Sequence, residues 1–158
     1  GRCRGEVGTE VRLSLRRDGT TTERTLRRAA TGGAYYDVRS SLEEARGRRA
    51  GLIVVPAFQR ETSSQVVDAL RRLEGRADVL VVDLRGNVGG YMPAGSAVAS
   101  RFLPPGRTVA TEVGRPENAR ADARYVSDGV GAVETSLPLY LLVDGRTASA
   151  AEIFAAGV

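Results

Sequence analysis

The strongest constraint on the fold is a pair of apolar runs separated by a segment with helical periodicity. Residues 52–55 form a continuous apolar run, and residues 79–84 form a second run that is apolar at all but one position. Such runs are typical of strands buried on both faces of a sheet. Between them, residues 66–73 carry apolar side chains at helical spacing, and Gly75 ends the pattern. A strand, a helix and a second strand in this order predict an α/β fold with crossover connections.

Further segments continue this alternation. Residues 62–65, Thr-Ser-Ser-Gln, fit a capping box that predicts the start of the first helix. Pro93 fits the first turn of a second helix, with Val98 and Phe102 on its apolar face. The other elements expected in this core are strands at 108–113 and 139–143 and a helix at 148–156.

The N-terminal part has a different pattern. Residues 10–17 alternate apolar and polar side chains, which predicts a half-buried strand, and residues 20–28 predict a returning strand. Asp18 and Gly19 between them are typical of a tight turn, so we expect a β-hairpin. Because one hairpin does not form a domain by itself, we expect it to pair with another segment.

The connection between these parts contains weaker signals. Residues 31–33 resemble a linker, and residues 35–39 predict a strand. Residues 41–44, Ser-Leu-Glu-Glu, fit a second capping box, which predicts a short helix that ends at Gly47.

The composition excludes several kinds of catalyst. All 23 basic residues are arginine, histidine is absent, and Cys3 is the only cysteine. These 158 residues therefore contain no Ser-His-Asp or Cys-His system, no histidine-ligated zinc site, no internal disulfide and no Schiff-base lysine. We expect neither a metal nor a cofactor. A catalyst in this chain has to use hydroxyls, carboxylates, arginine or backbone dipoles, or borrow a base from outside.

The net charge of +4 does not indicate a nucleic-acid partner. Arginine pairs are scattered along the chain with acidic residues among them, and no aromatic residues alternate with them as in a single-strand binding surface. A solvated surface is the simpler interpretation. No apolar run approaches the roughly 20 residues of a membrane helix, so we do not expect stable membrane insertion.

Two motifs could carry chemistry, and each follows an expected strand. In residues 83–90, Asp-Leu-Arg-Gly-Asn-Val-Gly-Gly, the glycine pair allows backbone N–H groups to converge on an anion, although tight turns use the same residues. In residues 146–152, Arg-Thr-Ala-Ser-Ala-Ala-Glu, small neighbours leave Ser149 open at the start of a helix, although Ser is also a common N-cap. Together they supply a nucleophile and two N–H donors, as acyl transfer requires.

At these two motifs the chain resembles the carboxy-terminal processing, or tail-specific, serine peptidases. The resemblance covers nearly the whole chain, with the two motifs in the family's order. It implies a crotonase/ClpP-like catalytic core, preceded by the last hairpin of a PDZ domain. The implied domains are residues 1–30, the end of a truncated PDZ domain, and residues 31–158, a truncated peptidase core.

The resemblance also assigns roles to residues. It makes Ser149 the nucleophile of a Ser-Lys dyad, and it makes the backbone N–H groups of Gly90 and Ala150 the oxyanion hole. The residues expected to support this site rather than react are Gly89, Asp83, Arg85 and Glu152.

The chain departs from the family pattern at three points. Val88 stands in place of a usual proline, which should loosen the turn, and Ala151 replaces a frequent serine. The family's general-base lysine lies further downstream than Val158, and this chain has no lysine. Because both ends also look cut, we expect a fragment of a longer protein that is inactive alone.

Substrates and setting follow only from the resemblance. It implies proteins with flexible, apolar C-terminal tails as substrates, in the bacterial periplasm or envelope or in the thylakoid lumen. Two alternatives stay open: a non-catalytic relative that binds peptides or acts as a scaffold, and a crotonase-type enzyme that polarises an acyl-CoA thioester.

Overall fold

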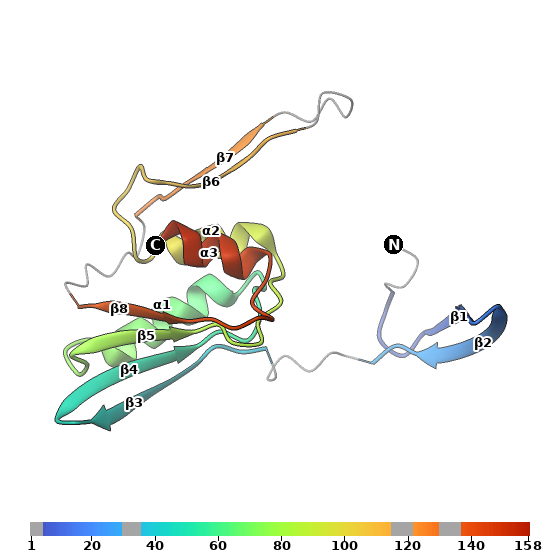
Figure 1. Ribbon diagram of the computed structural model, residues 1–158, viewed down its shortest axis with the longest axis horizontal. Coiled ribbons are helices and arrows are strands. Elements are labelled where there is room, and N and C mark those ends of the chain that lie inside the picture. Colours follow the sequence, from blue (N-terminus) through green and yellow to red (C-terminus); the bar gives the residue numbers. More distant parts are fainter. Residues whose placement is uncertain (1–4, 30–35, 115–121, 130–136) are drawn as a thin grey trace. The chain divides into compact units, whose positions relative to one another are not determined.

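The computed structural model describes residues 5–29, 36–114, 122–129 and 137–158 (Figure 1). The chain divides into two compact units, Gly1–Gly33 and Ala34–Val158. Cys3 lies outside the described residues. No helix in the described ranges has the length and apolar character needed to cross a membrane.

The first unit contains the predicted β-hairpin. Strands β1 (Glu10–Arg17) and β2 (Thr20–Arg27) pair antiparallel over their full length. Asp18 and Gly19 have φ angles of 49° and 77°, the conformation of a two-residue turn that follows the twist of its strands. Leu15 and Leu26 remain exposed within this unit. The hairpin is therefore confirmed, while its membership of a PDZ domain stays a prediction.

The second unit is built on a mixed four-stranded sheet. Its order is β3 (Arg39–Ala45), β4 (Arg48–Val54), β5 (Val79–Asp83) and β8 (Leu139–Leu142). Strands β4, β5 and β8 are parallel, and β3 is antiparallel to β4 at the edge. The apolar runs thus form neighbouring parallel strands, and the predicted α/β class is confirmed.

The helix predicted from residues 41–44 is wrong, because these residues belong to β3. Arg46 and Gly47 have φ angles of 53° and 73° and form a two-residue turn that pairs β3 with β4. The Ser41 hydroxyl donates to the Glu43 carboxylate at 2.7 Å rather than capping a helix. Leu42 packs against the core from this strand, so period-two alternation prevailed over the capping pattern.

Helix α1 (Thr62–Leu73) confirms the predicted amphipathic helix but not its capping box. Its N-cap is Glu61, and Thr62 is already helical, with its hydroxyl accepting a bond from the Gln59 N–H at 2.8 Å. The Gln65 side chain does not cap the helix. It accepts a bond from the Val38 N–H and donates to the Asp37 carboxylate. The helix therefore begins one residue earlier than a Thr62 cap requires.

The Gln65 contacts also explain why the strand predicted at 35–39 is wrong. Residues 36–38 form a turn and a bend whose polar groups bond to α1, and β3 begins only at Arg39. Residue 35 lies outside the described residues.

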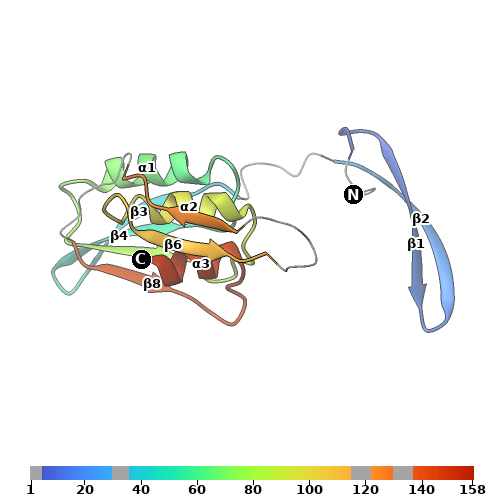
Figure 2. The ribbon, with the colours of Figure 1, turned by 90° about the horizontal axis from the view of Figure 1, so that it is seen from above.

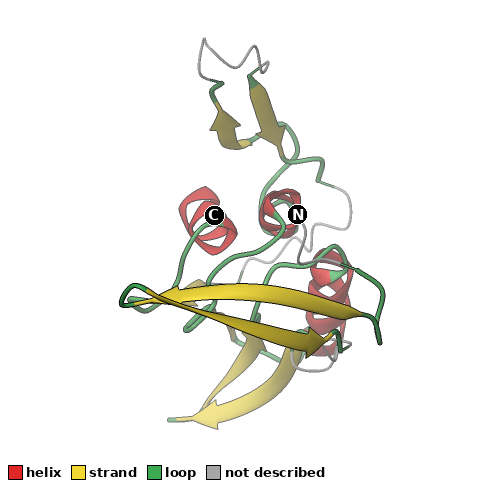
Figure 3. Cartoon of the chain, turned by 90° about the vertical axis from the view of Figure 1, so that its right-hand side faces the viewer, coloured by secondary structure: helices red, strands yellow, loops and turns green. Residues whose placement is uncertain are grey.

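Helix α2 (Met92–Ala99) lies between α1 and α3 (Ala150–Gly157), as Figure 2 shows from above. A two-stranded sheet of β6 (Thr108–Glu112) and β7 (Ala123–Val126) packs against α2 and α3. In Figures 1 and 3, these two helices lie between that hairpin and the four-stranded sheet. The strand predicted at 108–113 is therefore real, but it lies outside the central sheet.

The core joins the sheet to the helices through aromatic side chains. Phe154 of α3 is fully buried, and its ring centroid lies 6.2 Å from that of Phe58 and 5.8 Å from that of Phe102. Val98 is also fully buried, whereas Phe102 follows the end of α2. This cluster fixes α3, and with it Ser149 at the start of that helix.

Replacing Phe154 by alanine should lower the free energy of unfolding by about 3–5 kcal/mol, because it leaves a cavity between two other rings. Urea denaturation measures this loss. Tyr140→Ala, at an exposed position of β8, is the control and should cost less than about 1 kcal/mol. Equal losses in the two variants would contradict this account of the core.

Candidate active site

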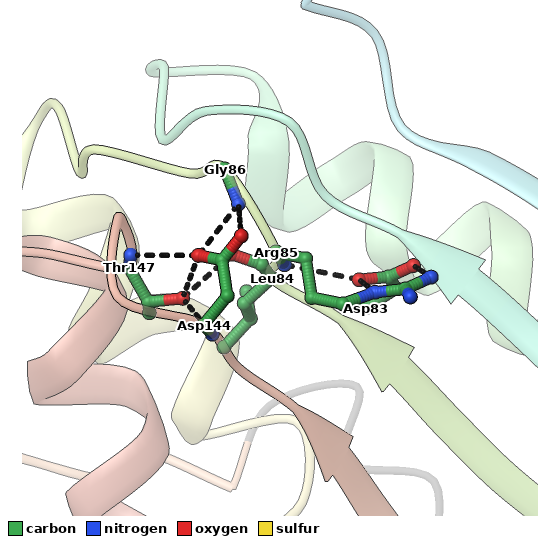
Figure 4. Close-up of polar contacts among 6 residues, drawn as sticks. All are labelled: Asp83, Leu84, Arg85, Gly86, Asp144 and Thr147. Carbon is green, nitrogen blue, oxygen red and sulfur yellow. Dashed lines mark hydrogen bonds and ion pairs between the residues drawn. The ribbon is translucent and has the colours of Figure 1, made fainter.

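The first motif forms a turn at the carboxyl end of β5. The Arg85 guanidinium binds the Asp83 carboxylate through Nε and a terminal nitrogen, at 3.0 and 2.7 Å, and the Arg85 backbone N–H donates to the same carboxylate at 3.0 Å. These bonds lower the pKa of Asp83, with the side-chain bond from Arg85 as the largest cause. The pair therefore locks the start of the turn (Figure 4).

Asn87 connects this turn to two other segments. Its side chain is fully buried, donates to the Val55 carbonyl at 2.7 Å and accepts a bond from the Gly89 N–H at 2.8 Å. Its own carbonyl accepts a bond from the Ala148 N–H at 3.0 Å. One residue thus joins the end of β4, the glycine pair and the segment before Ser149.

Asp144 and Thr147 make a second connection between the two motifs (Figure 4). The Asp144 carboxylate accepts bonds from the N–H groups of Gly86, Arg146 and Thr147 at 3.0–3.1 Å. The Thr147 hydroxyl donates to the Leu84 carbonyl at 3.0 Å. The N–H bond from Gly86 is the largest of the causes that lower the pKa of Asp144.

Neighbouring atoms leave no room for a side chain on Gly89 or Gly90. Gly90 has a φ of 140°, and a Cβ there would lie 2.1 Å from the Phe58 carbonyl oxygen. Phe58 donates its N–H to the Gly89 carbonyl at 2.9 Å and accepts one from Tyr91 at 2.7 Å. A Cβ on Gly89, whose φ is 96°, would lie 2.7 Å from the Cβ of Ser149. The pair is therefore held against both the Phe58 segment and Ser149.

Ser149 occupies the N-cap position of α3 with an unusual backbone. Its φ and ψ are 57° and −122°, a region that side chains other than glycine rarely adopt. The Glu152 carboxylate accepts a bond from the Ser149 N–H at 2.7 Å, and the Glu152 N–H donates to the Ser149 carbonyl at 2.9 Å. Ser149 itself is exposed, so the strained turn presents it at the surface.

Two backbone donors near Ser149 have no acceptor. Within the part of the chain that the structure describes, no group accepts a hydrogen bond from the N–H of Gly90 or of Ala150. The Ala150 N–H would lie 3.0 Å from a Cβ on Gly89, so the glycine turn runs directly past the start of α3. In such an arrangement the hydroxyl can attack a carbonyl carbon, and the two N–H groups can donate to the oxyanion that forms.

The structure brings the sequence-predicted site residues to one edge of the sheet. Ser149, Ala150 and Glu152 begin α3, and Gly89 and Gly90 lie in the turn beside them. Asp83 and Arg85 bind each other at the start of that turn, and their predicted role stays a prediction.

Sequence reasoning missed Asn87, Asp144 and Thr147. The spacing of Asp144 and Thr147, shortly after β8, is typical of a side-chain-capped turn and could have indicated their bonds. Nothing in the local sequence indicated that Asn87 would be buried.

Comparison with known proteins gives a consistent result. Residues 49–158 match the model of peptidase family S41. The carboxyl-terminal-processing protease of Picosynechococcus sp. is 32% identical over 155 residues, which cover 98% of this chain and 36% of that protein. The chloroplastic carboxyl-terminal-processing peptidase 2 of Arabidopsis thaliana is 34% identical over 162 residues, with 96% and 29% covered. The chain thus spans about a third of the length of these relatives.

Solved structures share the fold. A photosystem II D1 C-terminal processing protease superposes with a TM-score of 0.64 at 25% identity, over 96% of this chain and 41% of that one. An S41 protease structure from Bacteroides fragilis superposes with a TM-score of 0.66 at 18% identity, over 92% and 42% of the two chains. At that identity the second likeness concerns the fold alone.

Gly89→Ala should disturb the site far more than Gly86→Ala. Both glycines have positive φ, but a Cβ on Gly86 has no atom within 4 Å, whereas one on Gly89 collides with Ala148 and Ser149. We expect unfolding free energies to fall by about 2–3 kcal/mol at Gly89 and by about 1 kcal/mol at Gly86. Urea denaturation gives both values, and the Ser149 and Ala150 amide signals in NMR spectra should shift only in the Gly89 variant. Equal behaviour would refute the close approach.

Asp144 should make the stability of the chain depend on acidic pH. Its pKa in the folded chain is lowered from the ordinary 3.8, so its stabilisation is complete above about pH 4 and is lost as pH falls through the folded-state value. Asp144→Asn should therefore be less stable at pH 7, and should lose less stability than the parent chain between pH 7 and pH 3. Urea denaturation at both pH values measures the two losses, and identical losses would argue against this role.

Proposed function

The chain belongs to peptidase family S41, and from this premise we propose that it carries the nucleophile and oxyanion hole of a serine endopeptidase of the C-terminal processing type. The observation that carries the proposal is the start of α3, where exposed Ser149 lies in a strained turn beside two unpaired backbone N–H groups. The names of the relatives, which are processing proteases, support the same reaction class.

In the proposed reaction the Ser149 Oγ attacks the carbonyl carbon of the scissile peptide bond. The N–H groups of Gly90 and Ala150 donate to the carbonyl oxygen as it becomes negative, and the N-terminal end of α3 adds a favourable dipole. The tetrahedral intermediate then expels the amine, which takes up a proton, and leaves an acyl-enzyme. Water attacks this ester, releases the new C-terminus and returns the proton to Ser149.

The base that accepts the Ser149 proton is proposed to be a lysine outside these residues. The 158 residues contain neither lysine nor histidine, and the nearby Glu152 carboxylate already accepts a bond from the Ser149 backbone. A partly desolvated lysine amine can be unprotonated near neutral pH and so act as a base. Without it the Ser149 hydroxyl has no activator, and we propose that these residues alone are inactive.

The remaining site residues are proposed to position the reacting groups. Gly89 allows the turn to pass Ser149, and Glu152 fixes the Ser149 backbone. The Asp83 and Arg85 pair holds the start of the turn that ends at Gly90. Gly89 and Glu152 contact Ser149, whereas Asp83 and Arg85 bond to each other in the glycine turn, and none of the four takes a proton in the proposed mechanism.

The proposal extends to the substrates and the cellular location. We propose protein substrates with flexible, apolar C-terminal tails, presented by a PDZ domain to which residues 1–30 belong. The separation of the unit Gly1–Gly33 from the unit Ala34–Val158 supports such a boundary. A site of action outside the cytoplasm, in a bacterial envelope or periplasm or in a thylakoid lumen, is in keeping with the chloroplastic name of one relative.

A chimera tests the function. Residues 1–158 replace the matching segment of the Picosynechococcus protease, and the product is incubated with an unstructured peptide that has an apolar C-terminus. We expect cleavage by the chimera, and at least about a 1,000-fold lower rate after Ser149→Ala, because the nucleophile is lost.

Two controls make the result decisive. The isolated 158-residue chain should not cleave the peptide, and thermal unfolding should show that both chimeras are folded. A folded chimera without activity would favour a non-catalytic peptide-binding protein, and cleavage by the isolated chain would remove the need for an external base.

A further inference from the structure

A pocket of about 740 Å³ lies beside the proposed active site. Its walls come from the start of β3, the end of β4, the turn after β5 and the loop before α3. Gly86 and Val88 line it, and both belong to the turn that leads to Gly90. A molecule bound there would therefore touch the same turn that supplies a proposed oxyanion donor.

The lining of the pocket carries positive charge. Arg39, Arg85 and Arg146 line it, and none of the described residues in its lining is acidic. Arg85 already binds Asp83 through Nε and one terminal nitrogen, which leaves its other terminal nitrogen to donate elsewhere. Among the described residues, the guanidinium groups of Arg39 and Arg146 form no hydrogen bond and no ion pair. Two complete guanidinium groups are therefore free to bind an anion.

The position of Arg146 connects the pocket to the chemistry. It precedes Ser149 by three residues, and its backbone N–H binds the Asp144 carboxylate that also holds Gly86. The backbone that carries this cation is thus fixed by the same bonds that order the catalytic turn. Among the described residues no ion pair joins Asp144 to an arginine of the pocket, but its charge acts on Arg85, whose pKa is raised first by the bond to Asp83 and further by Asp144.

We propose that this pocket binds a carboxylate of the polypeptide substrate close to the scissile bond. The carboxylate could come from an acidic side chain or from the chain terminus, since both present the same two oxygens. Guanidinium groups bind such oxygens in a bidentate geometry, and they stay protonated at every pH at which the protein is folded. The role as a substrate subsite depends on the proposed peptidase function, but binding of the carboxylate itself does not.

Small probes separate the two sources of the carboxylate. The ¹⁵N-labelled chain is titrated with N-acetyl-glutamic acid α-amide, which has only a side-chain carboxylate, and with N-acetyl-alanine, which has only a terminal one. N-acetyl-glutamine amide, which has neither, is the neutral probe. We expect saturable NMR shifts at the amides of Gly86 and Val88 with at least one carboxylate probe and none with the neutral probe. The probe that binds identifies the source.

Variants locate the binding. Arg39→Gln and Arg146→Gln should each lower the affinity for the carboxylate probe by about 10-fold, because each removes a charged donor. Arg107→Gln is the matched control: it removes the same charge from an exposed residue that does not line the pocket, and it should leave the affinity unchanged. Equal affinity in all three variants, or no saturable shift with either carboxylate, would overturn the proposal. Tighter binding of inorganic phosphate than of both carboxylates would also overturn it.

This test can fail independently of the proposed function. Ser149→Ala should leave probe binding unchanged, because Ser149 does not line the pocket. An inactive chimera with intact probe binding would reject the peptidase and keep the anion site. An active chimera without probe binding would reject only the anion site.

Discussion

The buried amide of Asn87 is the interaction on which the geometry of the site depends. Its side chain is out of contact with water, so both of its polar atoms need partners, and they find them at Val55 and Gly89. Its carbonyl takes a third bond, from Ala148. Three segments that are distant in sequence are therefore registered against one another by a single residue, and the spacing between the glycine pair and Ser149 follows from that registration.

Much of the fold could be predicted because it depends on local periodicity. The apolar runs form β4 and β5, and the segment with helical periodicity between them forms α1. The errors lie where one short pattern fits two structures. Residues 41–44 fit both a capping box and a strand. The turn at Arg46 favours the strand, but arginine is not a residue type from which a positive φ is predicted. The pairing of β3 with β4, which makes these residues a strand, cannot be predicted from a four-residue segment.

The candidate site was predictable to a similar extent. The groups that we propose to react lie in two contiguous motifs, so the sequence pointed to Ser149 and the glycine pair directly. The bonds between the motifs were not predictable, since Asp144 acts on Gly86 across 58 positions of the chain. Such bonds join side chains to backbone groups, and every residue has a backbone group. Only the folded chain specifies which N–H a carboxylate will reach.

The backbone of Ser149 has a consequence for how folding and function compete. Glycine adopts a φ of 57° without steric cost, whereas a residue with a Cβ is strained at the φ and ψ of Ser149, by about 1–3 kcal/mol. A chain shaped by stability alone would place glycine at this position. The presence of a hydroxyl-bearing residue means that the phenylalanine cluster under α3 and the bonds from Glu152 hold the turn in a conformation that it would not adopt unaided. The buried core therefore keeps the exposed Ser149 side chain in a strained backbone conformation at the surface.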